Sequence, residues 1–223
     1  MPIPGSSKKK SQRTLVARIA AGSGYDVRLA KNLAQTTSAN AATMWILCPW
    51  LDRFPKNTGV WLSVLASHDA NEGLLEALSA SKERRPKVYA GVFAVDTLRP
   101  MGRLIRRLKG EGITGVINFP SISFIDGEAG AVLNGLSLGV DRELGFLEAC
   151  SGEGLRIAGV TRSIDTAQRL VQMGVDFLIV HGGPPTRTNA DPSLEVAKKV
   201  EGVAQGLIPV IPLSRVRRSN DRG

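Results

Sequence analysis

Cysteine, histidine and aromatic residues are scarce in this 223-residue chain. The two cysteines, Cys48 and Cys150, are too few for a disulfide framework and lack the spacing of a zinc site. Aromatic residues make up 5% of the chain, too few for a platform that stacks nucleic-acid bases. No apolar run approaches the ~20 residues that a membrane-spanning helix needs, and the N-terminus lacks the apolar core of a secretory signal. We therefore expect a cytoplasmic protein that does not enter a membrane.

Positive charge is concentrated at the two ends of the chain, although the net charge is +9 overall. Residues 1–13 carry four basic residues and no acid, and residues 215–223 carry four arginines against one aspartate. Because the body is nearly balanced, we interpret residues 1–13 and 215–223 as flexible basic tails and residues 14–214 as a single domain. Nucleic-acid binding by the tails is a weaker alternative to this interpretation.

Apolar runs of strand length alternate with segments of helical periodicity, which is typical of βαβ units and a parallel sheet. The seven expected strands are residues 15–21, 43–48, 88–95, 115–119, 156–160, 177–180 and 207–211. This pattern predicts an α/β fold, a TIM (β/α)8-type barrel that is incomplete because the eighth strand is missing. An open doubly wound sheet is the competing architecture. A partner chain would cover the open edge, so we expect a homo-oligomer.

Helical spacing of apolar residues predicts surface helices over residues 71–81, 101–110 and 165–173. Ser163 and Asp165 are suitable N-caps for the third of these helices. Residues 49–67 hold two tryptophans without clear periodicity, and we expect them to form a long loop over one end of the sheet.

Polar residues and glycines that follow the strands form the candidate site, because loops at the carboxyl ends of parallel strands converge on one mouth. These residues are Asp96, Asn118, Ser121, Asp126, Thr161, His181, Gly182 and Gly183. Structural alternatives exist: Asp96 suits a turn or helix cap, and His181 suits a hydrogen-bonded strand end. The glycine pair suits a phosphate cradle, although Pro184 and Pro185 remove two backbone donors. The chain has no P-loop and no His-Glu-x-x-His motif.

Five short segments together resemble a known family. They are Ala90–Asp96, Gly115–Ser121, Ile125–Gly127, Asp69–Glu72 and Val180–Gly183. In order and spacing, over residues 15–185, they resemble the TIM-barrel phosphoenolpyruvate hydrolase-like family, which is related to phosphonopyruvate hydrolase and phosphoenolpyruvate mutase.

The resemblance implies a barrel mouth that acts on a small phosphorylated or phosphono 2-oxo acid with the help of Mg²⁺. Matching residue by residue, Asp96 would hold the metal or its water shell, Asn118 would orient substrate oxygens, and His181 would transfer a proton or bind an oxyanion. The remaining members of the candidate set would contact substrate; they are Ser121, Asp126, Thr161, Gly182 and Gly183.

Three segments depart from the family pattern: Cys48–Leu51, Pro184–Arg187 and Ile211–Ser214. The departures fall where these barrels commonly grip a phosphorylated substrate. Two hypotheses therefore remain, an active hydrolase-like enzyme and a catalytically inactive barrel that binds a ligand or a protein partner. Convergence of the three catalytic candidates on one open pocket would favour the enzyme, whereas a mouth plugged by Trp50 or Trp61 would favour the inactive barrel.

Overall fold

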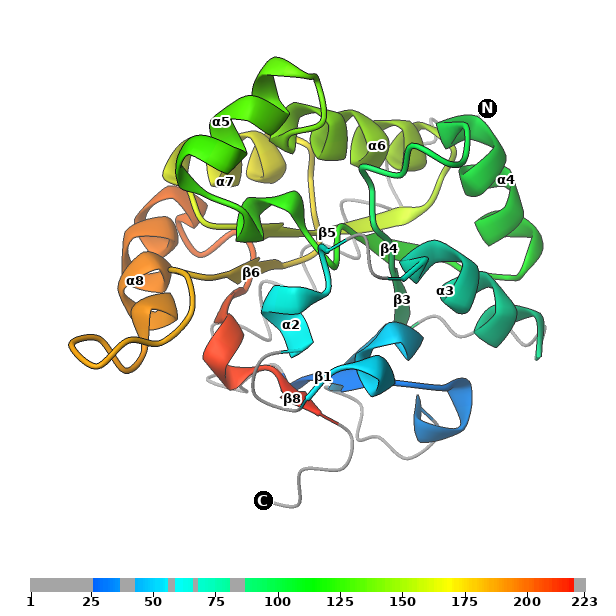
Figure 1. The fold of residues 1–223 in the computed structure, drawn as a ribbon, viewed down its shortest axis with the longest axis horizontal. Helices are drawn as coiled ribbons and strands as arrows, with labels where there is room; N and C mark the ends of the chain where they lie inside the picture. Colours follow the sequence, from blue (N-terminus) through cyan, green and yellow to red (C-terminus); the bar gives the residue numbers. More distant parts are fainter. Residues whose placement is uncertain (1–25, 37–42, 56–58, 66–67, 81–86, 219–223) are drawn as a thin grey trace, which may run out of the picture.

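Eight parallel strands form the centre of the protein in a computed structural model that describes residues 26–36, 43–55, 59–65, 68–80 and 87–218. They pair in the order β7-β6-β5-β4-β3-β2-β1-β8, and helices lie around the curled sheet (Figure 1). The strands are β1 (Asp26–Ala30), β2 (Thr43–Leu47), β3 (Val88–Gly91), β4 (Gly115–Ile117), β5 (Arg156–Thr161), β6 (Leu178–Val180), β7 (Val210–Pro212) and β8 (Arg217–Arg218). This architecture, a TIM-like incomplete barrel, confirms the predicted fold class.

The two ends of the strand order differ from the sequence prediction. The expected strand at residues 15–21 lies outside the described residues, and β1 is instead Asp26–Ala30. An eighth strand is present, because Arg217 pairs with Arg28 of β1. The expected basic tail at residues 215–223 thus includes this strand, because nothing in the side chains of Arg217 and Arg218 signals one. A two-residue edge strand depends on backbone pairing alone, which side-chain patterns do not reveal.

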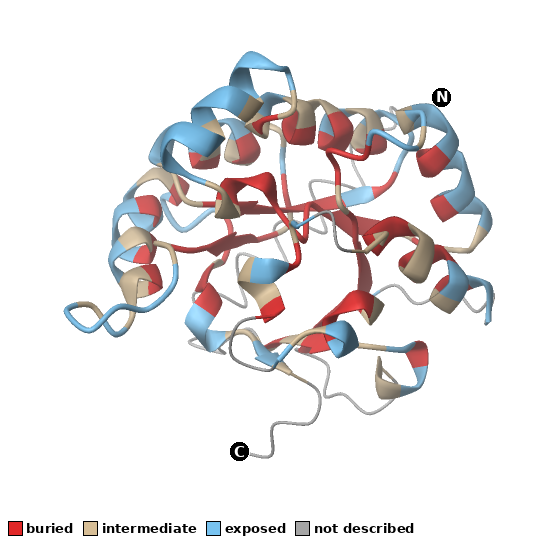
Figure 2. Cartoon of the chain, viewed as in Figure 1, coloured by how far each residue is buried: buried red, intermediate tan, exposed pale blue. Residues whose placement is uncertain are grey.

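The central strands β2, β3, β4 and β6 are buried on both faces, which explains their near-continuous apolar sequences (Figure 2). Along β2, Ile46 points into the barrel interior with Phe119 and Phe177, whereas Leu47 belongs to the layer between the sheet and the helices. Successive residues of a strand face opposite sides, so one apolar run supplies both cores.

Seven α-helices lie in the described part of the chain: α2 (Gly59–Leu62), α3 (Ala70–Ser79), α4 (Met101–Gly110), α5 (Gly127–Gly135), α6 (Val140–Gly152), α7 (Ile164–Gln172) and α8 (Pro192–Ala204). The predicted helices at 71–81, 101–110 and 165–173 correspond to α3, α4 and α7, and Ser163 caps α7 by accepting from Thr166 N–H. Among the described helices, none has the length and apolar character required to cross a membrane.

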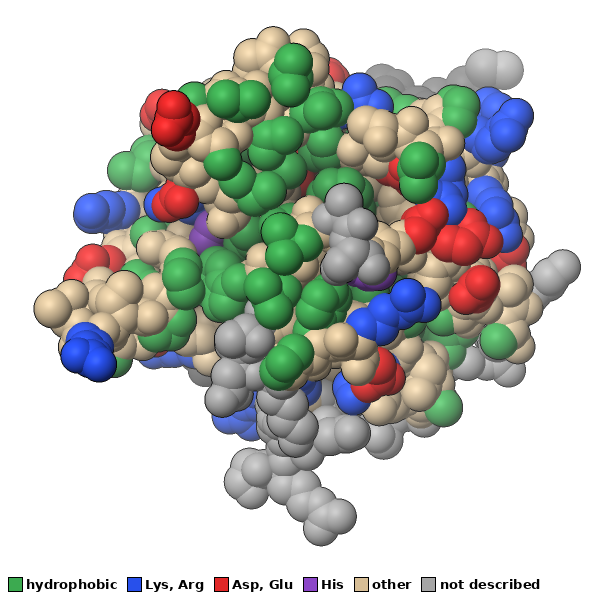
Figure 3. All heavy atoms as spheres, viewed as in Figure 1, with side chains coloured by type: hydrophobic (Ala, Val, Ile, Leu, Met, Phe, Trp, Pro, Cys, Tyr) green, Lys and Arg blue, Asp and Glu red, His purple; other side chains and the backbone are tan. Residues whose placement is uncertain are grey.

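The expected loop at residues 49–67 contains short helical turns. A 3₁₀ turn, η2 (Pro49–Arg53), is followed by α2, which lies across the centre of the face seen in Figure 1. Further 3₁₀ turns are η1 (Leu33–Thr36), η3 (Ile122–Phe124) and η4 (Leu213–Arg215). Hydrophobic side chains gather on this face around α2 and α5 (Figure 3), and α5 buries none of its residues.

Candidate functional site

The predicted site residues lie after the carboxyl ends of the strands, but they fall into separate groups. Asp96 lies in the loop between β3 and α4, whereas Asn118 and Ser121 follow β4 and His181 follows β6. Asn118, Ser121 and His181 belong to one hydrogen-bonded network, which does not include the side chain of Asp96. The three catalytic candidates therefore follow strand ends but do not share one set of contacts, and their catalytic roles stay predictions.

The Asp96 carboxylate is held by four protein donors. Its Oδ1 accepts from the backbone N–H groups of Leu98 and Arg99 at 2.7 and 3.1 Å. Its Oδ2 accepts from Asn71 Nδ2 at 2.8 Å and from the Arg99 guanidinium at 3.0 Å. This is the geometry of an aspartate that fixes a turn. Arg99 extends the cluster because it also pairs with Asp69 and Glu72.

These donors do not suit a Mg²⁺ site at Asp96. A carboxylate offers about four lone-pair positions, and here protein N–H groups occupy all four. Within the described ranges, no three side chains drawn from His, Cys, Asp and Glu form a group that could hold a metal ion. The metal-binding role of Asp96 stays a prediction that the donor set does not support.

Asn71 joins α3 to the loop after β3. Its amide nitrogen donates to the carbonyl of Phe93 at 2.9 Å, and its Oδ1 accepts from Phe93 N–H at 3.0 Å. Asn71 is 1% exposed, so it is a buried bridge between two segments of the chain. The Asp69–Glu72 and Ala90–Asp96 segments of the family resemblance are thus connected by structural hydrogen bonds.

Replacing Asn71 with leucine should destabilise the protein by about 3 kcal/mol, because it removes partners from the buried groups of Phe93 and Asp96. Urea unfolding followed by circular dichroism would measure this change. Ser79→Ala is the matched control on α3, since the Ser79 hydroxyl makes only an exposed hydrogen bond to Glu76. A loss below about 1 kcal/mol for Asn71→Leu would contradict the bridging role.

A second cluster is centred on Glu143 of α6, which is 0% exposed. Its carboxylate accepts from Asn118 Nδ2 at 2.7 Å, from Ser121 Oγ at 2.8 Å and from the backbone N–H of Ile122 at 2.6 Å. Asn118 also bonds the backbone of Val160 in β5, with its Oδ1 accepting at 2.7 Å and its Nδ2 donating at 3.1 Å. Asn118 therefore continues the β4–β5 pairing beyond the strand ends.

A buried chain of hydroxyl groups connects Glu143 to His181. Ser121 Oγ lies 2.7 Å from Ser123 Oγ, which lies 2.9 Å from His181 Nε2. If Glu143 is ionised, each group donates toward the carboxylate, from the imidazole through both serines. His181 Nδ1 is buried and has no hydrogen-bond partner among the described residues.

Aromatic rings cover the His181 imidazole. The ring centroids of Phe124 and Trp61 lie 4.6 and 5.6 Å from it, both in edge-on arrangements. Trp61 comes from α2, the helix that crosses the mouth. Trp61 therefore covers the side chain of a catalytic candidate, an arrangement closer to the inactive barrel than to an open active site.

Burial shifts the pKa values of His181 and Glu143, the two groups at the ends of the hydroxyl chain. Desolvation, with a smaller contribution from Arg162, lowers the pKa of His181 to about 3, so its imidazole is neutral at physiological pH. Desolvation raises the pKa of Glu143 to about 7 despite its three hydrogen bonds. A histidine with such a low pKa is poorly matched to general acid–base catalysis near neutrality.

Asp126 and Thr161 line a pocket of about 410 Å³ between α5 and the start of α7. Arg162 also lines it, and its guanidinium lies 2.6 Å from the carboxylate of Asp126. This hydrogen bond and the charge of Arg162 hold the pKa of Asp126 below its usual value. Ser123 contributes to the same pocket. The pocket therefore combines apolar walls with hydroxyl groups and one ion pair, and it reaches the hydroxyl chain.

Gly182 and Gly183 lie beside a different pocket. A Cβ at Gly182 would come within 2.4 Å of the Pro192 carbonyl oxygen, so glycine permits β6 to approach the start of α8. Gly183 has a φ of 98° and lines a pocket of about 340 Å³. The structure thus gives Gly182 a packing function, while contact of either glycine with a substrate stays a prediction.

Two glycine spacings resemble short enzyme motifs but occur in the wrong context. Gly110–Gly115 has Gly-x-Gly-x-x-Gly spacing, yet it leads from α4 into β4, opposite to the strand-to-helix order of a dinucleotide loop. Gly135–Gly139 has Gly-x-Ser-x-Gly spacing, yet it joins α5 to α6 and its Ser137 is exposed. Neither spacing carries a function here.

Sequence reasoning missed Glu143, Ser123 and Arg162, and it named Trp61 as a plug of the mouth but not as a partner of His181. Glu143 lies in the first turn of α6, where an acidic residue is ordinary, and only the fold shows that it is buried. Ser123 follows Ser121 by two residues, and Arg162 follows Thr161 directly. Extending the strand-end criterion by one or two residues would have found these last two.

Comparison with known proteins identifies the family of this chain. The model of the family described as phosphoenolpyruvate hydrolase-like matches residues 10–207. The chain is 32% identical over 153 residues to the uncharacterized protein y4oT of Sinorhizobium fredii, covering 69% of this chain and 78% of that protein.

Two longer proteins match as well. A putative transcriptional regulatory protein, y4pA, of the same organism is 26% identical over 76% of this chain, and the matched part is 25% of its length. The ToMV resistance protein Tm-1(GCR237) of Solanum lycopersicum is 30% identical over 57% of this chain, which is 17% of its length. Since the family model covers most of the sequence, this chain belongs to the phosphoenolpyruvate hydrolase-like family.

Proposed function

We propose that this chain is a ligand-binding member of the family, which holds a small phosphorylated or phosphono 2-oxo acid without hydrolysing it. One observation carries the proposal: Arg162 lines a pocket that also holds several hydroxyl groups, whereas Asp96, Asn118 and His181 are occupied by protein contacts. The ligand class comes from the family, and the pocket supplies a cation for its acidic group.

The pocket has the size and chemistry for such an acid. About 410 Å³ lies within the usual range for small-molecule sites. Arg162 offers a planar donor suited to phosphate or carboxylate, and the hydroxyl-bearing residues Ser123, Thr161 and Thr166 line the same cavity. Asp126 accepts from Nη1 of Arg162, so an acid that takes the same donor competes with the Asp126 carboxylate.

The names of the longer relatives agree with a binding function. One is called a transcriptional regulatory protein and another a resistance protein, and in both the part matched by this chain is a quarter of the length or less. These names describe regulation and resistance rather than a chemical reaction. They support a barrel that serves as a binding module.

Isothermal titration with phosphoenolpyruvate and phosphonopyruvate tests the proposal. Arg162→Gln should weaken binding at least about tenfold, because it removes the charge-assisted contact. Asp126→Asn should strengthen binding several-fold, about 1 kcal/mol, because the competing carboxylate is lost.

The neighbouring Arg169–Asp141 ion pair supplies a matched control. Its N–O distance is also 2.6 Å, and neither residue lines the pocket. Arg169→Gln and Asp141→Asn should leave the affinity unchanged. An unchanged affinity in Arg162→Gln, or weaker binding in Asp126→Asn, would overturn the proposed site.

A further inference from the structure

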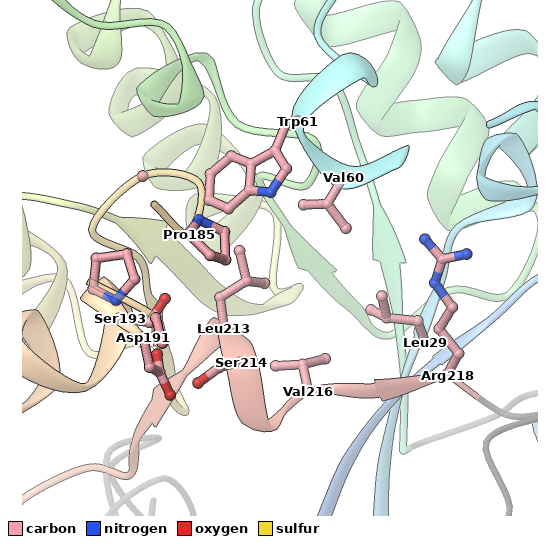
Figure 4. A pocket seen from close by; sticks show the side chains of 13 residues that line it. Leu29, Val60, Trp61, Pro185, Asp191, Ser193, Leu213, Ser214, Val216 and Arg218 are labelled. Atoms are coloured by element: carbon pink, nitrogen blue, oxygen red, sulfur yellow. The ribbon is translucent and has the colours of Figure 1, made fainter. Parts of the chain in front are cut away.

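The second pocket, of about 340 Å³, lies at the carboxyl ends of β1 and β6, and none of its lining residues belongs to the Arg162 pocket (Figure 4). Its walls come from segments far apart in the sequence: β1, α2, the loop from β6 to α8, and the segment from η4 to β8. Among its lining residues, Gly183 alone belongs to the set that the family resemblance assigns to substrate contact, and the proposed function does not use this pocket.

The middle of this pocket is apolar. Trp61 and Val60 of α2 lie on one side, and Leu213 and Val216 lie on the other (Figure 4). Leu29 of β1, which is 3% exposed, also contributes. A ligand that fills this region gains binding free energy because apolar surface is removed from water. The indole of Trp61 offers a flat contact for a ring.

The ends of the pocket carry opposite charges. Arg218 of β8 lies at one end, and Asp191 lies at the other end beside Ser193, with the apolar side chains between them (Figure 4). Asp191 also caps α8, where one carboxylate oxygen accepts from Leu194 N–H at 3.3 Å. Asp191 is half-buried and Ser193 beside it is 4% exposed, so this end is partly shielded from water, and charge complementarity strengthens binding there.

We propose that this pocket binds a small zwitterion with an apolar body, its carboxylate beside Arg218 and its ammonium group beside Asp191. The two charges of such a ligand are separated by a ring or a short aliphatic chain, matching the order of charged, apolar and charged walls. The inference is independent of the proposed function, because the two pockets share no residue.

The probe for this pocket is 4-(aminomethyl)phenylacetate, compared with 4-methylphenylacetate, which lacks the amine, and 4-methylbenzylamine, which lacks the acid. Titration calorimetry should show each truncated compound binding about tenfold more weakly than the zwitterion. In ¹⁵N-labelled protein, the indole N–H signal that disappears in Trp61→Phe should shift on addition of the probe.

Variants of Arg218 and Asp191 test which side chain binds each charged end of the ligand. Arg218→Gln should weaken binding of the zwitterion about tenfold and leave binding of 4-methylbenzylamine unchanged. Asp191→Asn should weaken binding of the zwitterion and leave binding of 4-methylphenylacetate unchanged. Asparagine retains the helix cap. Arg215→Gln is the control, since Arg215 is exposed and does not line the pocket.

Three results would overturn the inference: equal affinities for the three compounds, no measurable binding of the zwitterion, or unchanged binding in both end variants. If Arg162→Gln rather than Arg218→Gln weakens binding of the zwitterion, the carboxylate of the zwitterion binds in the Arg162 pocket and the inference fails. Weak phosphoenolpyruvate binding would contradict only the proposed function.

Discussion

Lowering the pH from 6.5 to 4 is expected to destabilise the native protein by about 3 kcal/mol more than it destabilises His181→Phe. Burial lowers the pKa of His181 to about 3 in the folded protein, whereas an unfolded histidine titrates near 6.5. Below pH 6.5 the unfolded state therefore takes up a proton that the folded state refuses, and stability falls. Phenylalanine suits the aromatic surroundings and does not titrate.

Glu143 changes the free energy of unfolding with pH in the opposite direction. Its folded pKa of about 7 lies above the unfolded value of 4.5, so the folded state binds the proton more tightly. Stability from this group rises as the pH falls from 7 to 4.5, by about 3 kcal/mol, and Glu143→Gln removes that rise. Between pH 4.5 and 6.5 the two effects nearly cancel in the native protein.

Urea unfolding of the native protein, His181→Phe and Glu143→Gln at several pH values measures both slopes. The stability of His181→Phe should increase on acidification from pH 7 to 4.5, and that of Glu143→Gln should decrease. Parallel curves for all three proteins would show that neither group is buried as the hydrogen-bonded chain requires.

Replacing Asn118 with leucine should lower the melting temperature by about 10 °C, or prevent folding. The substitution removes a donor from the buried Glu143 carboxylate and both partners from the backbone of Val160. Loss of such buried contacts costs about 3–5 kcal/mol. In a domain of this size each kcal/mol corresponds to about 2–4 °C.

Thermal unfolding followed by circular dichroism measures this effect. Asn32→Ala is the control, because the Asn32 side chain accepts only an exposed hydrogen bond from Gln35 N–H. A shift below about 3 °C for Asn118→Leu would mean that the bridge between β4 and β5 is dispensable.

The barrel could be predicted from the sequence because its strands are buried on both faces and so read as apolar runs. Six of the expected strands correspond to β2 through β7, within a few residues at each end. The edge strand β8 could not be predicted, since Arg217 and Arg218 contribute only backbone pairing. Helices α2, α5, α6 and α8 were not predicted either, and α5 lacks the buried stripe that gives a helix its periodicity.

The candidate site was predicted in position but not in contacts. The position of Asp96, Asn118 and His181 after strands in the sequence predicts that they share one rim, because parallel strands bring their carboxyl ends together. It does not say which side chains the protein itself uses as partners. Arg99 for Asp96, Glu143 for Asn118 and Trp61 for His181 come from other segments, and the fold alone brings them into contact.

Pyruvate release from phosphoenolpyruvate and phosphonopyruvate, measured with Mg²⁺ at millimolar substrate, tests most directly whether the barrel binds without hydrolysis. We predict no more pyruvate than in the same buffer without protein, even at concentrations that saturate binding in calorimetry. Release by the native protein that disappears in both Asp96→Asn and His181→Phe would contradict the account and establish these residues as catalytic.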